Sequence, residues 1–223
     1  MSGIAVIVPA AGTGSRFGGA LPKQFQTLAG KPVIQHVIER FLLDELVTRV
    51  VVPVAPVLLE RVKNSERVTF VSGGDTRQQS VIRALAEVGE PELIAVHDAA
   101  RPLFSMAIFH AVIDAAREAG AALPVVPVAD TIHVMNADGT VAETLDRTML
   151  GAAQTPQCFH AAILRDILAR AEREGIEGTD EAGLAARFGY RVRAVPGDPR
   201  NLKITVPEDL AIAESYLQQW SAT

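Results

Sequence analysis

The stretch Ile4-Ala5-Val6-Ile7-Val8-Pro9-Ala10-Ala11-Gly12-Thr13-Gly14-Ser15-Arg16-Phe17-Gly18 decides the fold, together with Leu21-Pro22-Lys23 shortly after it. Residues 4–8 are a continuous apolar and partly β-branched run, which is typical of a strand buried on both faces of a sheet. Pro9 ends the strand because it has no N–H to donate. The small residues that follow let the backbone approach a ligand and point N–H groups at it. With two cations, Arg16 and Lys23, on the same edge, the stretch predicts a polyphosphate site.

The glycines alone allow a second interpretation, a tight strand-to-helix turn without a ligand. Phe17 stands where a dinucleotide fingerprint needs Gly or Ala, and the sequence has no G-x-x-x-x-G-K-[ST] string. Arg16 and Pro22-Lys23 favour the phosphate site over the plain turn. In this respect the stretch resembles nucleotidyltransferases that activate sugars or alcohols, which begin with a strand and an A-A-G-x-G-x-R…P-K segment.

Composition restricts the class of ligand. The 223 residues are 48% hydrophobic, which is enough for one domain with a full core. Only 5% are aromatic and the net charge is -5, without a long basic run. Few stacking side chains and an acidic balance argue against nucleic-acid partners. An anionic ligand must therefore be attracted by local cations.

Cysteine content and hydropathy indicate the compartment. Cys158 is the only cysteine, so an intrachain disulfide is impossible. No apolar run reaches the roughly 18 residues that span a bilayer, and no charged n-region precedes an apolar segment. We expect a cytoplasmic protein without a membrane partner.

Short apolar runs alternate with helical patterns along the chain. This alternation predicts an α/β fold: a Rossmann-like, mostly parallel sheet with helices on both faces, in one domain over residues 1–223. Ligands of such sheets bind beyond the carboxyl ends of the strands. Pro9 to Gly12, Gly73-Gly74-Asp75 and Asp98 all fall there. The expected strands are 4–8, 49–54, 68–71, 93–97, 121–128, 190–195 and a short one at 201–205; the expected helices are 33–42, 57–62, 80–85, 104–119, 160–174, one from Thr179, and 206–217.

A hairpin interrupts the alternation after Asp130. Residues 131–135 and 140–144 flank the turn Asn136-Ala137-Asp138-Gly139. A lone hairpin is marginal in water and must pack on something. A second copy of the chain is the simplest partner, so we expect residues 130–150 to form an arm exchanged between the protomers of a homodimer.

The segment Gly73-Gly74-Asp75-Thr76-Arg77-Gln78-Gln79-Ser80 also allows two interpretations. In one, Asp75 caps a helix start and Ser80 is a surface hydroxyl. In the other, the backbone of the loop and Ser80 hold a nucleobase or ribose.

The segment His97-Asp98-Ala99-Ala100-Arg101-Pro102 follows a buried strand. Asp98 at such a strand end can hold Mg²⁺ through one carboxylate, while water and phosphate oxygens complete the shell. The alternative is a surface Asp98–Arg101 ion pair of little energetic weight. We interpret His97 as a buried, satisfied side chain, and no His/Cys spacing supports zinc.

Taken together, these motifs closely resemble one family over essentially the whole chain. In order, they match the 2-C-methyl-D-erythritol 4-phosphate cytidylyltransferases of the non-mevalonate isoprenoid pathway. The matching strings are Ala10-Ala11-Gly12-x-Gly14-x-Arg16, Pro22-Lys23, Gly73-Gly74-x-x-Arg77-x-x-Ser80-Val81, Val96 to Pro102, Asp130-Thr131, Asp146-Arg147, Gln154 to Gln157, Thr179-Asp180-Glu181 and Asn201 to Thr205.

The resemblance implies a reaction and a set of roles. CTP and methylerythritol phosphate would give CDP-methylerythritol and pyrophosphate, with Mg²⁺ at Asp98. The implied catalytic cations are Arg16, Lys23 and Lys203. The implied nucleotide-binding residues are Pro9, Ala10, Ala11, Gly12, Thr13, Gly14, Ser15, Gly74, Asp75, Ser80 and Ala99. The implied acceptor-binding residues are Asp98, Arg101, Thr131, Arg147, Thr155 and Thr179, with Arg147 supplied by the partner's arm.

Three other functions compete with this one. The nearest is a cytidylyltransferase of the same architecture that acts on ribitol 5-phosphate. A non-catalytic nucleotide-binding regulator leaves the cations Lys23 and Lys203 unexplained. A dinucleotide dehydrogenase is disfavoured by Phe17 and by the lack of a clear acidic residue after the second strand.

Overall fold

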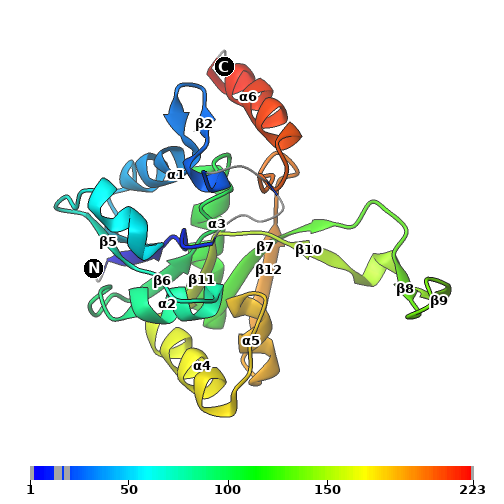
Figure 1. The fold of residues 1–223 in the computed structure, drawn as a ribbon. Helices are drawn as coiled ribbons and strands as arrows, with labels where there is room; N and C mark the ends of the chain where they lie inside the picture. Colours follow the sequence, from blue (N-terminus) through cyan, green and yellow to red (C-terminus); the bar gives the residue numbers. More distant parts are fainter. Residues whose placement is uncertain (1–2, 13–16, 18–20, 222–223) are drawn as a thin grey trace.

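A mixed eight-stranded sheet forms the centre of the molecule (Figure 1). The structure is a computed structural model that describes residues 3–12, 17 and 21–221. The strand order is β10-β7-β11-β6-β1-β4-β5, and β12 also pairs with β7. The strands are β1 (Ile4–Ile7), β4 (Val47–Val54), β5 (Val68–Ser72), β6 (Leu93–Val96), β7 (Ala121–Pro127), β10 (Gly151–Ala153), β11 (Gln157–His160) and β12 (Val192–Pro196).

The first half of the chain builds the parallel part of the sheet. β1 pairs in parallel with β4 and β6, and β4 pairs in parallel with β5. β11 then runs antiparallel to both β6 and β7, and β10 runs antiparallel to β7. The mostly parallel sheet is confirmed, whereas the antiparallel strands β10 and β11 were not expected from the sequence. They are short, and β11 directly follows Pro156, so neither has a clear periodic pattern.

Helices cover both faces of the sheet. They are α1 (Val33–Leu42), α2 (Arg77–Leu85), α3 (Met106–Ala119), α4 (Ala161–Glu174), α5 (Glu181–Arg187) and α6 (Glu208–Ser221). The side chains of β1 show the two layers, because Ile4 and Val6 belong to the core under α1 and α3. Ala5 and Ile7 point the other way, into the core under α2, α4 and α5. Apolar burial on both faces explains the unbroken hydrophobic run of β1.

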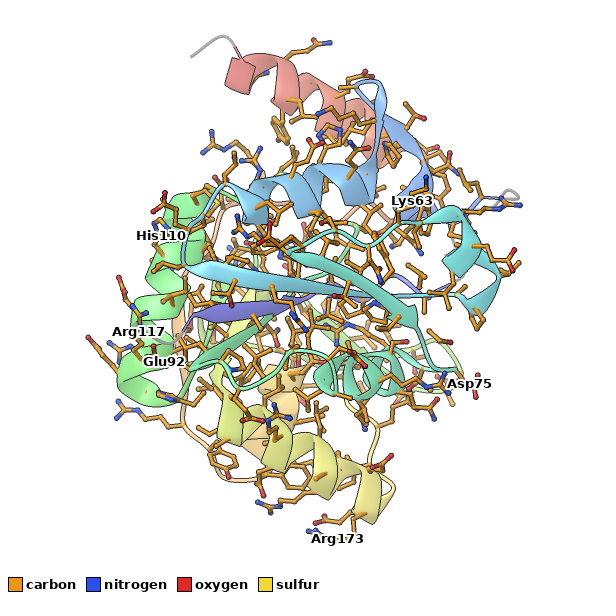
Figure 2. The ribbon with its side chains drawn as sticks, turned by 90° about the vertical axis from the view of Figure 1, so that its left-hand side faces the viewer. Lys63, Asp75, Glu92, His110, Arg117 and Arg173 are labelled. Carbon is orange, nitrogen blue, oxygen red and sulfur yellow. The ribbon has the colours of Figure 1, made fainter. Side chains whose placement is uncertain are left out.

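Local signals fix the helix boundaries. Ser105 caps α3 by accepting a hydrogen bond from the N–H of Ile108. α3 and α4 both end at glycines with positive φ, Gly120 and Gly175. Figure 2 shows Arg117 of α3 beside Glu92, the residue before β6, and the Arg117 Nε lies 3.3 Å from the Glu92 Oε1.

Small elements near the amino end complete this part of the fold. The short strands β2 (Thr27–Leu28) and β3 (Lys31–Pro32) form a two-stranded sheet after the 3-10 helix η1 (Lys23–Phe25). A third apolar cluster joins Leu28 and Val33 to Ile204 and to Ala213 of α6. In the part of the chain that is described, no helix is long and apolar enough to cross a membrane.

Two expected elements differ from the prediction. The expected helix at residues 57–62 is the 3-10 helix η2 (Pro56–Arg61), which has no buried side chain. Leu58 and Leu59 pack against the core only in part, and a segment of six residues gains little stability from an α-helical register. The expected strand at 201–205 does not form, because the N–H of Ile204 donates to the carbonyl of Ala100 rather than to a neighbouring strand.

The hairpin arm projects from the body of the molecule, as expected (Figure 1). β8 (His133–Met135) and β9 (Val141–Thr144) pair antiparallel in a sheet of their own, and the 3-10 helix η3 (Arg147–Met149) follows them. Large apolar side chains of the arm are exposed in the single chain. They are Val134, Met135, Val141 and Met149.

Candidate active site

A cleft of about 390 Å³ opens beyond the carboxyl ends of the parallel strands. The loops after β1, β5 and β6 form its walls, as expected for an open α/β sheet. The residues that line it are Pro9, Ala11, Gly12, Phe17, Lys23, Gln24, Gly74, Asp75, Thr76, Arg77, Ser80, Asp98, Ala99, Ala100, Lys203 and Thr205.

A smaller pocket of about 150 Å³ adjoins the cleft. Arg77, Asp98 and Lys203 line both cavities and therefore mark their junction. The other lining residues of the smaller pocket are Arg101, Ala153, Gln154, Thr155, Gln157, Thr179 and Asp180.

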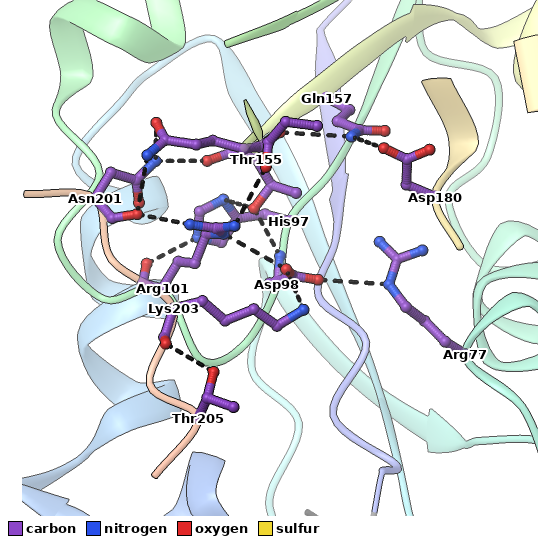
Figure 3. Close-up of polar contacts among 12 residues, drawn as sticks. Arg77, His97, Asp98, Arg101, Thr155, Gln157, Asp180, Asn201, Lys203 and Thr205 are labelled. Atoms are coloured by element: carbon purple, nitrogen blue, oxygen red, sulfur yellow. Dashed lines mark hydrogen bonds and ion pairs between the residues drawn. The ribbon is translucent and has the colours of Figure 1, made fainter. Parts of the chain in front are cut away.

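Three cations surround the carboxylate of Asp98 at the junction (Figure 3). The Lys203 Nζ lies 2.8 Å from its Oδ2, the Arg101 Nε lies 3.5 Å from the same oxygen, and the Arg77 Nε lies 3.4 Å from Oδ1. Burial opposes ionisation of Asp98, but the charges of Arg77 and Lys203 outweigh it and hold its pKa well below the ordinary value. The junction thus combines a fixed carboxylate with an excess of positive charge.

The backbone of Asp98 is fixed by the buried residues behind it. Its N–H donates to the Thr155 Oγ1 over 3.0 Å, and this hydroxyl also lies 3.1 Å from the His97 Nδ1. The His97 Nε2 faces the carbonyl of Arg101 at 2.9 Å and must carry the proton there. Burial lowers the pKa of His97 to about 3, so the ring is neutral and Nδ1 accepts. The Thr155 hydroxyl therefore donates to His97. The interpretation of His97 as a satisfied core side chain is confirmed.

The loop between β5 and α2 forms the second wall of the cleft. The N–H of Gly74 donates to the Ser80 Oγ over 3.0 Å, and this hydroxyl donates to the Thr76 carbonyl over 2.9 Å. Ser80 is therefore a buried side chain that stabilises the loop, rather than a surface hydroxyl. A Cβ on Gly73 would lie 2.2 Å from that of Ala11, so only glycine lets the two loops approach this closely.

Helices α2 and α5 are each capped one residue after the position that the sequence suggested, which was one possible cap at Asp75 and the start of a helix at Thr179. α2 is capped by Thr76, whose Oγ1 accepts from the N–H of Gln79, and not by Asp75. Asp75 keeps its side chain available at the cleft, near the edge of the molecule (Figure 2). α5 is capped by Asp180, which accepts from the N–H of Gly183, rather than by Thr179.

Gln24 holds the start of the first loop and was missed by the sequence analysis. Its Nε2 donates to the carbonyls of Ala10, over 2.6 Å, and Gly12, over 2.9 Å. With both carbonyls held by one amide, the segment has a fixed conformation beside Lys23. Ala10 is buried below the cleft rather than lining it. The expectations for Thr13, Gly14, Ser15 and Arg16 lie outside the described residues.

The expected acceptor-binding residues fall into two groups. Asp98, Arg101, Thr155 and Thr179 line the smaller pocket. The other two belong to the arm region: Thr131 is exposed, and the Arg147 Nη1 donates to the carbonyl of Ala129. Neither of these two lines the cleft or the smaller pocket in the single chain.

An ion pair beside the smaller pocket also escaped the sequence analysis. The Arg77 Nη1 lies 2.7 Å from the Oε1 of Glu181, whose side chain is 1% exposed. Gln157 joins the same region by donating to Asp180 and accepting from the N–H of Ala182. Arg77 belongs to a motif that the sequence displays, but its partner lies in a distant helix.

The carboxylate of Asp98 is the acid that both cavities share. Within residues 3–12, 17 and 21–221, no three His, Cys, Asp or Glu side chains gather in a group that could hold a metal ion. The described side chains alone therefore do not form a complete set of metal ligands. Oδ1 of Asp98 lies 3.4 Å from the Arg77 Nε, whereas Lys203 and Arg101 contact Oδ2, so Oδ1 fits a single carboxylate ligand to Mg²⁺ that phosphate oxygens also bind.

The whole chain is similar to proteins of one family. The family model described as 2-C-methyl-D-erythritol 4-phosphate cytidylyltransferase matches residues 4–219. Proteins of that name from Acidobacterium capsulatum and Symbiobacterium thermophilum are 42% and 43% identical; the alignments cover 97% of this chain and 98% and 93% of those proteins.

Solved structures agree with the sequence comparison. The crystal structure of 2-C-methyl-D-erythritol 4-phosphate cytidylyltransferase from Thermus thermophilus has a TM-score of 0.83 and 34% identity, over 97% of this chain and 99% of that one. The Francisella tularensis structure of the same enzyme has a TM-score of 0.85 and 28% identity, over 96% and 99%. The match spans the loops that form both cavities, and the chain belongs to the 2-C-methyl-D-erythritol 4-phosphate cytidylyltransferase family.

Proposed function

We propose that this chain transfers a cytidylyl group from CTP to 2-C-methyl-D-erythritol 4-phosphate and releases pyrophosphate. The observation that carries the proposal is the pair of adjoining cavities with Asp98, Arg77 and Lys203 at their junction. The larger cleft, between the loops after β1 and β5, takes CTP. The smaller pocket takes the acceptor, so that its phosphate meets the α-phosphate of CTP at the junction.

The chemistry needs positioned cations and no general base. The phosphate of the acceptor is already an anionic nucleophile. One of its oxygens attacks the α-phosphorus, the bond from that phosphorus to the bridging oxygen of the β-phosphate breaks, and pyrophosphate leaves. The main barrier is the approach of one anion to another, which fixed positive charge lowers.

Lys203 and Lys23 supply this charge in the described part of the site. Asp98 holds the Lys203 ammonium at the junction, 2.8 Å from its Oδ2. Lys23 lines the cleft beside the loop that Gln24 fixes. We assign Lys203 to the reacting phosphates and Lys23 to the triphosphate. Arg16, in the family motif, is proposed as a third cation.

Mg²⁺ is the proposed cofactor. Asp98 would hold it through Oδ1, and the oxygens of the triphosphate would complete its shell. When bound, the ion supplies charge neutralisation for the phosphates. Asp98 has the ionised form this role requires, because its cationic neighbours lower its pKa.

The arm is proposed to complete the acceptor pocket of a second protomer. Its exposed apolar side chains, among them Val134 and Val141, are the kind of surface that a homodimer covers. Thr131 and Arg147 would then reach the partner's smaller pocket and add a cation for the acceptor phosphate. We also propose a cytoplasmic location and no nucleic-acid partner, as the composition favours.

The test is release of pyrophosphate from CTP with Mg²⁺, measured side by side with methylerythritol phosphate and ribitol 5-phosphate. We expect kcat/KM for methylerythritol phosphate to exceed that for ribitol 5-phosphate by at least about 100-fold, since a polar pocket rejects a poorly matched polyol. Faster release with ribitol 5-phosphate would identify ribitol 5-phosphate as the acceptor instead. No release with either substrate, together with tight CTP binding, would indicate a nucleotide-binding regulator rather than an enzyme.

A further inference from the structure

Arg77 stands between the two cavities and contacts a carboxylate on each side. It is the first residue of α2, and its side chain is 27% exposed. Its Nε lies 3.4 Å from the Oδ1 of Asp98, and its Nη1 lies 2.7 Å from the Oε1 of Glu181 (Figure 3 shows the contact with Asp98). Because Arg77 lines both the cleft and the smaller pocket, its guanidinium faces the place where the two substrates meet.

Glu181 is buried at a cost that the fold alone does not explain. Its side chain is 1% exposed, and Arg77 is its ion-pair partner. Its Oε2 has no hydrogen-bond partner among the described residues. A buried, half-satisfied carboxylate usually destabilises a fold relative to an apolar side chain. The start of α5 does not need it, because Asp180 already caps that helix. What Glu181 does provide is a fixed position for the Arg77 guanidinium.

The guanidinium retains donors after both contacts are made. Arginine has five N–H donors in a planar fork; Asp98 engages the one on Nε, and Glu181 engages one of the two on Nη1. Nη2 makes no hydrogen bond to any residue that the structure describes. A planar, fixed guanidinium with open donors matches the geometry of phosphate oxygens better than an ammonium does.

The charge of the smaller pocket also favours a phosphate. Its lining cations are Arg77, Arg101 and Lys203, and its lining carboxylates are Asp98 and Asp180. Among the side chains that line the smaller pocket, three cations therefore stand against two carboxylates before a ligand enters. An organic phosphate monoester brings the complementary charge, whereas a neutral polyol does not.

We propose that Arg77 binds the phosphate of the acceptor at the junction and that Glu181 positions Arg77 to do so. This inference rests on the proposed function. It adds to that function one residue that binds the acceptor phosphate, Arg77, and one that positions it, Glu181. Glu181 contacts no substrate. It acts through the orientation of the guanidinium, in the way that a buried carboxylate fixes a catalytic side chain.

The decisive variant is the double substitution Arg77→Met with Glu181→Met. It removes both charges together, so no buried carboxylate is left unpaired, and it preserves apolar packing. If the pair only stabilises the fold, the double variant recovers the activity of the wild type. If Arg77 binds the phosphate, the double variant folds and binds CTP but uses the acceptor poorly.

We expect the Tm of the double variant to stay within about 5 °C of the wild type and its affinity for CTP, measured by calorimetry, to stay within about 3-fold. We expect kcat/KM for methylerythritol phosphate to fall by about 100-fold or more, as the loss of a preorganised charge does. Arg77→Lys keeps the charge and the ion pair but loses the planar fork of donors. It should lower kcat/KM for methylerythritol phosphate by about 10-fold. If the double variant does not fold, Arg77→Lys decides the question.

The control is Lys31→Met with Glu39→Met. This ion pair has the same 2.7 Å distance, but it is exposed and lines neither cavity. This control variant should leave kcat/KM for methylerythritol phosphate and the affinity for CTP unchanged. A folded Arg77/Glu181 double variant with kcat/KM within about 3-fold of the wild type would overturn the inference. Because every constant is compared with that of the wild type, an inactive wild type would count against the proposed function instead, and binding of inorganic phosphate by calorimetry would then test Arg77 separately.

Discussion

The Nζ of Lys203 lies 2.8 Å from the Oδ2 of Asp98, and this contact joins two distant segments of the chain at one point of the site. The carboxylate follows a core strand, whereas the lysine belongs to an irregular segment near the carboxyl end. Asp98 thereby holds a cation where the cleft and the smaller pocket meet. Two anionic substrates can approach one another at such a place.

Removal of either Lys23 or Lys203, the two lysines proposed as catalytic, should nearly abolish turnover. We expect Lys23→Ala and Lys203→Ala each to lower kcat by about 100-fold or more, because each removes preorganised charge. Steady-state release of pyrophosphate measures the effect. Lys63→Ala is the control, since Lys63 is exposed and lines neither cavity (Figure 2 shows its position). Turnover near that of the wild type in either lysine variant would refute its assignment.

Arg147→Ala should mainly weaken binding of the acceptor, because the arm is proposed to add a cation to the acceptor pocket of the partner and not to the CTP cleft. We expect KM for methylerythritol phosphate to rise by about 10-fold or more, with little change in KM for CTP. An unchanged acceptor KM would count against a role of the arm in the site.

Mixing two impaired variants tests whether the arm acts in the partner's site. In a heterodimer of Arg147→Ala with Lys203→Ala, one site combines an intact arm with an intact body. Random exchange should then restore about a quarter of the activity of the wild type, because half of the dimers are mixed and each has one complete site. No recovery after verified subunit exchange would show that each arm serves its own protomer.

The stability of the protein should fall between pH 7 and pH 5 because of His97. Its folded-state pKa, about 3, lies below the value near 6.5 of an unfolded histidine. The unfolded chain therefore binds the proton first, and the contribution is complete above pH 6.5 and is lost as the pH falls toward 3. Between pH 7 and 5 this costs about 2 kcal/mol. In urea unfolding, the free energy of unfolding should fall between pH 7 and pH 5 by about 2 kcal/mol more in the wild type than in His97→Gln. Equal falls in the two proteins would contradict this prediction.

Gln24→Glu should weaken binding of CTP. It replaces the amide that donates to the carbonyls of Ala10 and Gly12 by a carboxylate, which leaves both unsatisfied and adds negative charge beside the cleft. We expect the Kd for CTP to rise by about 10-fold or more. Gln26→Glu is a matched control, because Gln26 makes the same kind of bond, to the carbonyl of Leu21, but lines neither cavity. Equal affinities in the two variants would rule out this role of Gln24.

The fold follows from local signals to a large extent. The apolar run of residues 4–8 predicts a strand buried on both faces, and Ile4 and Ala5 do pack into opposite cores. The hairpin at 136–139 is likewise evident from its turn residues. β11 escaped prediction because four residues of mixed character after a proline carry no periodic pattern. Its direction is set by β6 and β7, which flank it in the sheet.

The candidate site likewise contains residues that could be predicted from the sequence and residues that could not. Residues at strand ends, such as Asp98 and Gly74, could be chosen from the sequence because strand ends of an open sheet face the ligand. Partners brought together by tertiary structure could not: Arg77 with Glu181, and Gln24 with Ala10. Lys203 was chosen only through the family resemblance, because its segment lacks regular structure.

In the proposed reaction a cytidylyl group, and no other part of CTP, moves to the acceptor. The most direct measurement follows ³²P from CTP labelled at the α-phosphate, and in parallel from CTP labelled at the γ-phosphate, after incubation with methylerythritol phosphate. We expect the α label to enter the cytidine diphosphate product and the γ label to leave as pyrophosphate. Transfer of the γ label to the acceptor, or retention of both labels in CTP, would contradict it.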